Sequence, residues 1–451
     1  ISHPEVEEFI NMRKTTGGDL NRKCLNLHNG INITNDFLKA VSEDSEWRLI
    51  DPKTKTAVKI VSARNLWFQI LQTRMETGEP YVVNIDNCND ALPEEQKKLG
   101  LEIKQSNLCS EITLPTNEDR TAVCCLSSVN LEYFDEWSKV DTFIPDLITM
   151  LDNVLQHFID YPLQGEWPQY NEYMTNKDIS LEDFQKACME DKIGYAKAAY
   201  SAYRERSLGL GAMGFHSYLQ RNNIAFESMY ASSFNNKAFS YIKDNADKAT
   251  KKLAEERGEA PDMLGSGKRN AHLMAVAPNA SSSIICGGTS PSIEPNRANV
   301  YTHKTLTGSF KVKNKYLDDL LFELVPTNKK REEIWKDIAA HEGSVQHLDI
   351  LTDDQKEIFK TAPEINQIWI VEHAAMRQNY ICQSQSVNLF FKAPSIESSQ
   401  EDHNNFLQYL NDVHWAGAHR LKSMYYLRSD AARSTENVNV KIPKINLEEG
   451  C

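Results

Sequence analysis

Three polar side chains of different chemistry alternate along residues 105–115, which read QSNLCSEITLP. They are the amide of Asn107, the thiol of Cys109 and the carboxylate of Glu111. Alternate residues of an extended backbone point to the same side, so an extended segment would direct the three groups into one small volume. A nearby carboxylate disfavours a thiolate, so the trio favours a neutral thiol or a thiyl radical, with the carboxylate taking up a proton. The same alternation also fits the polar face of an exposed edge strand with a buried cysteine.

A second sulfur site, the adjacent pair Cys124 and Cys125, follows the first along the chain. The nine cysteines form no dense framework, which is typical of a protein of the reducing cytoplasm with buried or catalytic thiols. Neither CxxC nor HExxH spacing occurs, so no metal ligands are predicted. Cys451 ends a polar tail, where a cysteine has no packing role, and a redox role is therefore predicted for it.

A candidate anion site follows the apolar segment 273–277. A buried strand that leads into small hydroxyl residues at a helix start offers backbone N–H groups and a helix dipole to a phosphate. An ordinary serine-capped turn explains the same residues. The candidate residues are Pro278, Asn279, Ala280, Ser281 and Ser282.

Two further patterns have simple structural explanations. Gly209, Gly211 and Gly214 superficially match the dinucleotide fingerprint GxGxxG, but a charged helical segment precedes them, so close packing of a strand and a helix is the preferred interpretation. Tyr425 and Tyr426 are adjacent in a predicted strand, where neighbouring side chains point to opposite faces and fill a core without further function.

The composition indicates a globular protein. The 451 residues contain 41% hydrophobic and 9% aromatic residues, enough for a sizeable core. The net charge of −13 argues against nucleic acid as the main partner, and no apolar run is long enough to predict a membrane-spanning helix.

Helices and strands are predicted to alternate along the chain, which indicates an α/β architecture. The helix over 62–77 has Ser62 as its N-cap and ends at Gly78. Residues 45–56 are predicted to be a loop. The other predicted helices cover 139–160, 223–257, 364–380 and 399–422, and the predicted strands cover 80–89, 121–131, 273–277, 381–391 and 423–430.

Several of these segments together resemble the large, catalytic subunit of class I ribonucleotide reductases. The resemblance covers nearly the whole chain and keeps the motifs in order. They are QSNLCSEITLP at 105–115, AVCCLSSVNL at 122–131, RSLGLGAMGF at 206–215, APNASSSI with SIEP within 277–295, QSQSVNL at 383–389 and SMYYLRSD at 423–430.

The resemblance implies a ten-stranded α/β barrel of two antiparallel five-stranded halves, incomplete in this chain. It assigns residues 1–435 to the catalytic domain, with a finger loop around 105–115, and residues 436–451 to a flexible redox tail. It also predicts that the chain is the C-terminal portion of a large subunit, completed by a separate N-terminal chain that carries the missing strands and the second reducing cysteine.

Roles for individual residues also follow from the resemblance. Cys109 would be the thiyl-radical site, Glu111 would take the proton of the substrate 3′-hydroxyl, and Asn107 and Leu108 would contact the substrate. Cys124 aligns best with the barrel cysteine that supplies reducing equivalents, and which member of the Cys124–Cys125 pair reacts is left open. The remaining roles are a radical relay for Tyr425 and Tyr426, a diphosphate cradle for Pro278, Asn279, Ala280, Ser281 and Ser282, and reduction of the active-site disulfide for Cys451.

The implied activity is reduction of ribonucleoside diphosphates with no cofactor bound by this chain. The radical would come from a small subunit of the diiron-tyrosyl type, and thioredoxin or glutaredoxin would be the external reductant. Cys382 stands where an aspartate is expected, and no role is assigned to it. The alternatives are an anaerobic or triphosphate-using reductase, disfavoured by the tyrosine pair, and an inactive homologue that binds only nucleotide or the small subunit.

Overall fold

The computed structural model describes residues 1–163, 179–305, 308–395 and 397–429. The chain forms two compact units, one made of Ile1–Asn87 and Val387–Cys451 and the other of Cys88–Ser386. The predicted division into a catalytic domain over 1–435 and a tail over 436–451 stays a prediction, and the tail lies outside the described residues. No helix within the described ranges is long and apolar enough to cross a membrane.

The first unit contains a three-stranded sheet in the order β1-β4-β10. Strand β4 pairs in parallel with β1 and antiparallel with β10. Helix α3 begins after Ser62, which accepts the Asn65 N–H, and ends at Gly78 with a φ of +83°, as predicted. The elements of this unit are α1 (Val6–Asn11), η1 (Leu20–Arg22), β1 (Gly30–Ile33), α2 (Asn35–Ser42), β2 (Glu46–Ile50), β3 (Ala57–Ser62), α3 (Ala63–Thr77), β4 (Tyr81–Asn84), β9 (Leu389–Phe390), α18 (Gln400–Arg420), β10 (Ser423–Met424) and β11 (Leu427–Arg428).

Three sequence predictions for this unit are wrong in part. The predicted strand 80–89 ends at Asn84 and continues as helix α4 (Ile85–Asp90). The predicted loop 45–56 includes strand β2, which forms an antiparallel hairpin with β3. The predicted strand 423–430 is two short strands, β10 and β11, separated by Tyr425 and Tyr426.

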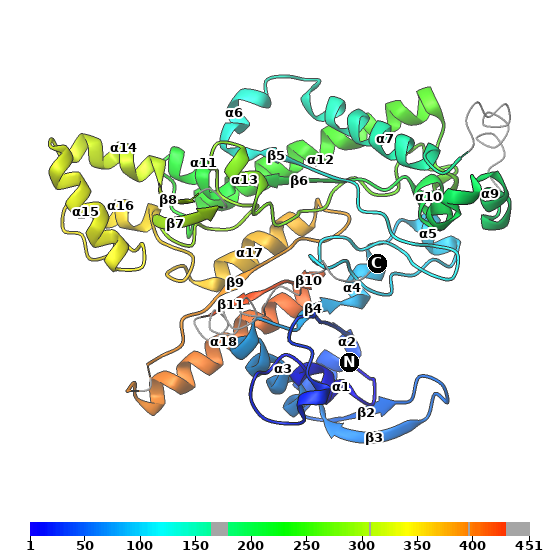
Figure 1. The fold of residues 1–451 in the computed structure, drawn as a ribbon, viewed down its shortest axis with the longest axis horizontal. Coiled ribbons are helices and arrows are strands. Elements are labelled where there is room, and N and C mark those ends of the chain that lie inside the picture. Colours follow the sequence, from blue (N-terminus) through cyan, green and yellow to red (C-terminus); the bar gives the residue numbers. More distant parts are fainter. Residues whose placement is uncertain (164–178, 306–307, 396, 430–451) are drawn as a thin grey trace, which may run out of the picture. The chain divides into compact units, whose positions relative to one another are not determined.

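The second unit contains the parallel pair β5 and β6, and helix α7 packs against β5 and α12, which in turn packs against α17; the elements are labelled in Figure 1. The predicted helices 139–160, 223–257 and 364–380 correspond to α7, α12 and α17. The elements that follow α4 are α5 (Glu94–Lys98), β5 (Leu126–Asn130), η2 (Leu131–Tyr133), α6 (Phe134–Trp137), α7 (Phe143–Asp160), α9 (Leu181–Ala187), η3 (Glu190–Tyr195), α10 (Ala196–Glu205), β6 (Gly209–Met213), α11 (Phe215–Arg221), α12 (Met229–Arg257), η4 (Pro261–Met263), α13 (Ser282–Ile285), β7 (Val300–Thr305), β8 (Gly308–Lys313), α14 (Lys315–Leu324), α15 (Asn328–Ala340), α16 (Asp353–Ile358) and α17 (Gln367–Gln378).

Two further extended segments continue the hydrogen bonding beside β6. Leu210 donates its N–H to the Leu273 carbonyl, and Val276 forms a parallel bridge with Gln385. Gly211 allows this close approach, because a Cβ atom there would lie 2.4 Å from the Ala275 carbonyl oxygen. Gly209 and Gly211 therefore lie in β6 and Gly214 lies just after it. This agrees with the prediction that these glycines allow a strand and its neighbours to pack closely.

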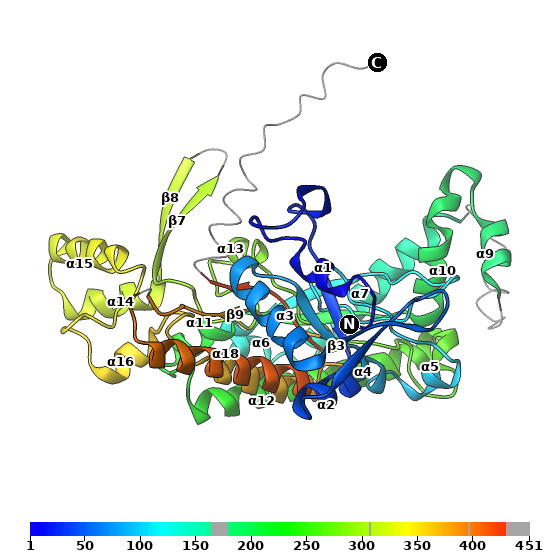
Figure 2. The same ribbon diagram turned by 90° about the horizontal axis from the view of Figure 1, so that it is seen from below.

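A helical subregion of the second unit has its own apolar core. Helices α14, α15 and α16 lie near the hairpin β7–β8 (Figure 1), and the hairpin projects beyond them in Figure 2. Leu317, Trp335, Ile338 and Val345 are fully buried in this core.

The described residues form one three-stranded and four two-stranded sheets, with no closed barrel among them. The α/β class is confirmed, whereas the ten-stranded barrel of two five-stranded halves stays a prediction.

Candidate active site

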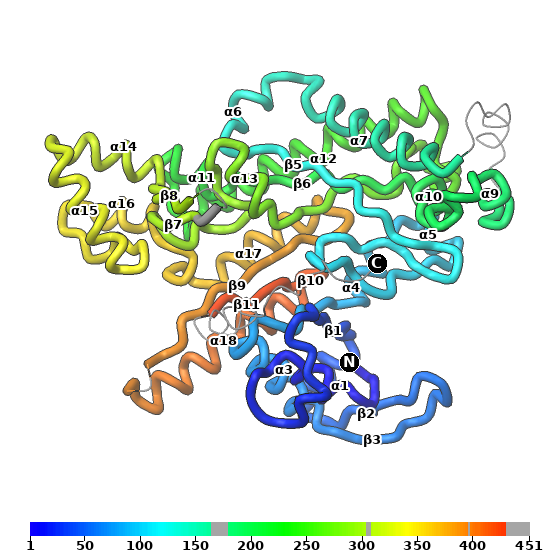
Figure 3. The backbone as a smooth tube through the Cα atoms, viewed as in Figure 1, coloured from blue at the N-terminus to red at the C-terminus, as the bar shows by residue number. Residues whose placement is uncertain are grey.

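Asn107, Cys109 and Glu111 lie on a tight turn. The extended backbone that was expected to point the three side chains the same way is therefore wrong. Ser110 donates its N–H to the Asn107 carbonyl at 3.1 Å and has a φ of +63°. The Asn107 side-chain oxygen accepts the N–H of Ile112 at 3.1 Å and closes the turn from the other side. The course of the loop between α5 and β5 can be followed in Figure 3.

Glu111 is a buried carboxylate with polar neighbours. It is 2% exposed, and burial raises its pKa, while hydrogen bonds from its own backbone N–H and from the Asn107 and Ser386 side chains oppose that rise. The Ser386 hydroxyl lies 3.4 Å from Oε2 of Glu111. A carboxylate with a raised pKa is suited to accept and return a proton near neutral pH.

Cys124 is brought together with Cys109 and Glu111. Burial first, and then the charges of Glu111 and Cys109, raise the pKa of the Cys124 thiol to about 11. As a whole residue Cys124 is exposed, although surrounding protein atoms partly shield its thiol, and Cys109 is half-buried. With a pKa of about 11, the Cys124 thiol is protonated at neutral pH.

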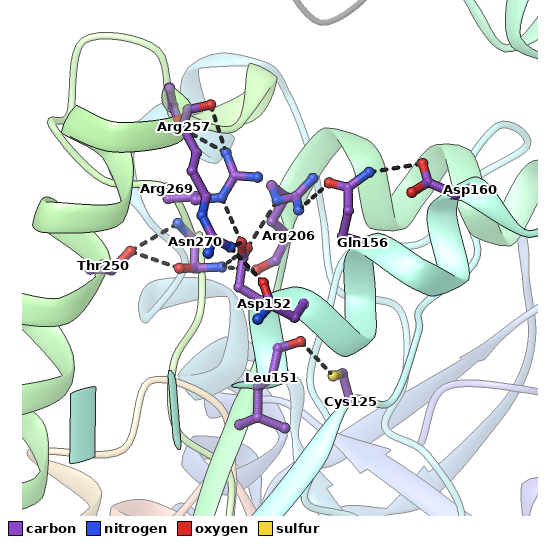
Figure 4. A network of polar contacts seen from close by, with 12 residues as sticks. Cys125, Leu151, Asp152, Gln156, Asp160, Arg206, Thr250, Arg257, Arg269 and Asn270 are labelled. Carbon is purple, nitrogen blue, oxygen red and sulfur yellow. Dashed lines mark hydrogen bonds and ion pairs between the residues drawn. The ribbon is translucent and has the colours of Figure 1, made fainter. Parts of the chain in front are cut away.

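Cys125 faces elsewhere. Its thiol is buried and lies 3.7 Å from the Leu151 carbonyl oxygen on α7, as Figure 4 shows. Burial and the charge of Asp152 raise its pKa to about 11. Of the two adjacent cysteines, Cys124 is the one that shares a site with Cys109.

Close to Cys125, an ionic network surrounds Asp152 on α7 (Figure 4). Asp152 is fully buried, and its two oxygens accept from Arg206 at 3.1 Å, Arg269 at 2.8 Å and Arg257 at 2.9 Å. Burial opposes ionisation, but Arg206 and Arg269 outweigh it and lower the pKa of Asp152. The network joins α7 to the end of α12 and to Arg206, which lies just before β6.

The segment 383–386 holds the 109–113 loop in place. Ser384 donates its N–H to the Glu111 carbonyl at 2.9 Å, and the Ser386 hydroxyl donates to the Cys109 carbonyl at 2.5 Å. Ser386 was missed as a site residue by sequence reasoning. The sequence feature that could have revealed it is the QSQS motif at 383–386, which is part of the family resemblance but carries no assigned role there.

The candidate phosphate loop is docked on β5. Asn279, with a φ of +52°, exchanges hydrogen bonds of 3.1 and 3.0 Å with the Ser128 hydroxyl. Ala280, Ser281 and Ser282 are exposed. In the described part of the chain, no group accepts the N–H of these three residues, so all three donors are available to an anion.

In the first unit, Tyr425 and Tyr426 pack against each other, with ring centroids 4.2 Å apart. The predicted opposite orientation is wrong, because the break between β10 and β11 lets the two rings meet. Tyr81 joins them at 4.7 Å from Tyr425 and 5.1 Å from Tyr426, and the Tyr426 hydroxyl lies 3.2 Å from Nδ1 of His28. Tyr81 and His28 are further members of this cluster that sequence reasoning missed, because they lie far away along the chain.

The remaining predicted residues are placed as follows. Leu108 is 60% exposed at the tip of the 107–110 turn. Pro278 is half-buried before the phosphate loop. Cys382 accepts the backbone N–H of Leu273 at 3.1 Å and of Met274 at 3.2 Å. Cys451 lies outside the described residues.

The second unit thus combines a half-buried thiol, a second protonated thiol, a buried carboxylate and an amide. This set can move hydrogen atoms and protons on a polar substrate, and it offers two sulfurs to a two-electron reduction.

Comparison with known proteins agrees with this chemistry. The family model described as "Ribonucleotide reductase, barrel domain" matches residues 1–266 and 261–427. The large subunit of ribonucleoside-diphosphate reductase of Invertebrate iridescent virus 3 is 42% identical over 97% of this chain and 72% of that protein. A putative large subunit of Frog virus 3 is 46% identical over 97% of this chain and 70% of that protein.

A solved structure is similar as well. The class Id ribonucleotide reductase alpha subunit of Actinobacillus ureae aligns with a TM-score of 0.74 and 35% identity, over 96% of this chain and 70% of that chain. The chain belongs to the ribonucleotide reductase family, as a large subunit with the α/β fold of that family.

Proposed function

We propose that this chain reduces ribonucleoside diphosphates to deoxyribonucleoside diphosphates by a thiyl-radical mechanism. The observation that carries the proposal is the grouping of Cys109, Glu111, Asn107 and Cys124 around one turn. The printed names of the viral relatives support the substrate class.

In the proposed reaction, Cys109 first loses its sulfhydryl hydrogen and becomes a thiyl radical. The radical takes the 3′ hydrogen atom of the ribose, and ionised Glu111 takes the 3′-hydroxyl proton while Asn107 hydrogen-bonds the substrate. Cys124 and a second thiol then supply two electrons and two protons, so that the 2′-hydroxyl leaves as water and the two sulfurs form a disulfide. The final transfer returns the 3′ hydrogen atom and regenerates the thiyl radical at Cys109.

The diphosphate would bind at Pro278–Ser282, with Leu108 at the edge of the substrate. Three backbone N–H groups that have no acceptor among the described residues, on the exposed residues 280–282, support an anion there, in a chain whose net charge is −13.

The radical would enter from a small subunit of the diiron-tyrosyl type through Tyr426 and Tyr425. The close packing of the two rings supports this, because short distances between redox-active rings favour electron transfer along the pair. Thioredoxin or glutaredoxin would restore the thiols through Cys451. An N-terminal partner chain that supplies the second thiol and completes the ten-stranded barrel stays a prediction.

The test is Cys109→Ser in the complex with its small subunit, assayed for deoxyribonucleoside diphosphate. We expect no product and unchanged subunit binding, while Cys24→Ser, a change at a half-buried cysteine of the other unit, keeps full turnover. Product formation by Cys109→Ser at the wild-type rate would overturn the proposed role of Cys109.

A further inference from the structure

Three potential metal ligands meet at the end of α15, in the helical subregion of the second unit. They are Asp337, His341 and His347, and one ligand atom from each lies within 4.8 Å of the others. Oδ1 of Asp337 is 3.3 Å from Nδ1 of His341, and Oδ2 is 3.0 Å from Nε2 of His347. The proposed reaction uses none of these residues.

The chemistry of the set selects the kind of cation. Two imidazoles and one carboxylate suit Zn²⁺ and similar borderline divalent ions better than Mg²⁺ or Ca²⁺, which prefer oxygen ligands. Neighbouring ligands on a tetrahedral zinc ion with bonds of ~2.0–2.1 Å are ~3.3 Å apart. The two carboxylate–imidazole distances are close to that spacing, and the three ligand atoms lie within 4.8 Å of one another, so side-chain movements alone can bring them to one ion.

The two imidazoles are arranged together. Their rings stack with centroids 3.7 Å apart and planes 24° apart, and both direct a nitrogen at the same carboxylate. Nδ1 of His341 also lies 2.9 Å from the Asp337 carbonyl oxygen, one helical turn earlier. Asp337 and His341 are exposed, and His347 is half-buried, so an ion can reach the cluster from solvent.

The backbone that carries the ligands is held by the core beneath it. Ile338, next to Asp337, and Val345, two residues before His347, are fully buried. Gly343 has a φ of +88° and donates its N–H to the Ile338 carbonyl at 2.8 Å. A Cβ at Gly343 would lie 2.5 Å from the Cβ of Ala298. The turn at Gly343 therefore packs closely against the backbone around Ala298.

Further hydrogen bonds pin the same turn. The Gly343 carbonyl accepts from both the backbone and the side chain of Asn299 at 3.1 Å. The Gln346 side chain donates to the Lys356 carbonyl at 3.0 Å. The ligands therefore stand on a backbone that is already ordered, which lowers the entropic cost of binding an ion.

We propose that Asp337, His341 and His347 form a three-ligand site for a Zn²⁺-like divalent cation, with water completing the coordination. On binding, each coordinating nitrogen releases its proton to water and the other ring nitrogen takes one up from water, so each imidazole holds the ion as the neutral ring of its other tautomer. The bound ion links Asp337, in the last turn of α15, to His347, in the turn that follows the helix, and thereby stabilises this subregion.

The test is titration of the full chain with Co²⁺, whose visible absorption reports coordination by nitrogen and oxygen. We expect one saturable equivalent in the wild-type chain and affinity at least about tenfold weaker in His341→Ala, His347→Ala and Asp337→Asn, since even outer-shell changes cost about that much. His157→Ala, an exposed histidine on α7, is the matched control and keeps wild-type affinity.

Two readouts separate this site from the thiols. Cobalt bound by cysteine gives an intense near-ultraviolet sulfur band, and the proposed site gives none. Zn²⁺ should also raise the thermal midpoint of the wild type and of His157→Ala, but not of His341→Ala/His347→Ala. Wild-type cobalt binding in all three ligand variants, or no binding by the wild type at millimolar Co²⁺, would overturn the proposal.

Discussion

The Ser386 hydroxyl lies 3.4 Å from the Oε2 atom of Glu111. The same hydroxyl is 2.5 Å from the Cys109 carbonyl oxygen, so one serine contacts both the residue of the proposed radical and the proposed base. Ser386 is fully buried, and water therefore cannot easily replace it.

Ser386→Ala should lower turnover by about 2- to 13-fold, the equivalent of one hydrogen bond of about 0.5–1.5 kcal/mol. It should also move the acid limb of the pH–rate profile upward. Burial raises the pKa of Glu111 and Ser386 opposes that rise, and the ionised form is the proposed base. Activity therefore appears as pH rises through this pKa, which is higher without Ser386. A limb that moves to lower pH would contradict this role.

The two adjacent cysteines should differ sharply. Cys124→Ser should abolish multiple turnover, because Cys124 shares its surroundings with Cys109 and Glu111. Cys125→Ser should keep turnover within a few-fold and destabilise the fold by about 1 kcal/mol, because it places a more polar group in a buried site. Steady-state assays and thermal melts of both variants check this, and equal loss of turnover would argue against the assignment.

Sequence reasoning placed the long helices well, because their caps and periodicity are local signals. Ser62 and Gly78 predict both ends of α3 correctly. The break at Tyr425–Tyr426 was not predictable in this way, because the strands on either side pair with different partners, β4 and β9.

The candidate site was predicted from an extended backbone that the structure does not have. Asn107, Cys109 and Glu111 do converge, but through a turn with a positive φ at Ser110, which strand periodicity cannot show. The choice between Cys124 and Cys125 required the position of α7, and the supports Ser386 and Tyr81 are separated from their partners by hundreds of residues. Such contacts depend on tertiary packing and leave no periodic signal in the sequence.

Tyr425→Phe and Tyr426→Phe should each reduce turnover by at least about a hundredfold, while the packing of the two rings is kept and the fold stays intact. The phenol hydroxyl is what makes a tyrosine oxidisable at an accessible potential, and phenylalanine lacks it. Tyr230→Phe, at a side chain that is 77% exposed, is the control and should keep full activity. Turnover and small-subunit affinity measured together would reveal whether a loss reflects binding instead.

Glu205 should make stability depend on pH. Burial raises its pKa to about 7, helped by Asp262 and opposed by His272 and Arg120, whereas an unfolded glutamate titrates near ~4.3. The protonated form therefore contributes stability that is fully present below about pH 4 and is lost as pH rises through about 7.

Glu205→Gln should remove this dependence and keep the contact with Gln96. Between pH 5 and pH 8 the wild type should lose up to about 3 kcal/mol more stability than the variant. Chemical denaturation at the two pH values measures the difference, with Glu43→Gln at an exposed site as the control. A variant with the wild-type pH dependence would show that another group is responsible.

Gly211→Ala should destabilise the second unit by about 1–3 kcal/mol or more, because the new methyl group would overpack the sheet. The methyl carbon would lie 2.4 Å from the Ala275 carbonyl oxygen, and backbone cannot move aside as a flexible side chain can. The same substitution at Gly194, where a Cβ meets nothing within 4 Å, should leave stability nearly unchanged. Because Ala275 lies just before the proposed phosphate loop, Gly211→Ala should also weaken substrate binding more than Gly194→Ala does. Thermal melts and KM values of the two variants test both effects, and a Gly211→Ala protein as stable as Gly194→Ala would contradict the close approach of β6 to residues 275–276.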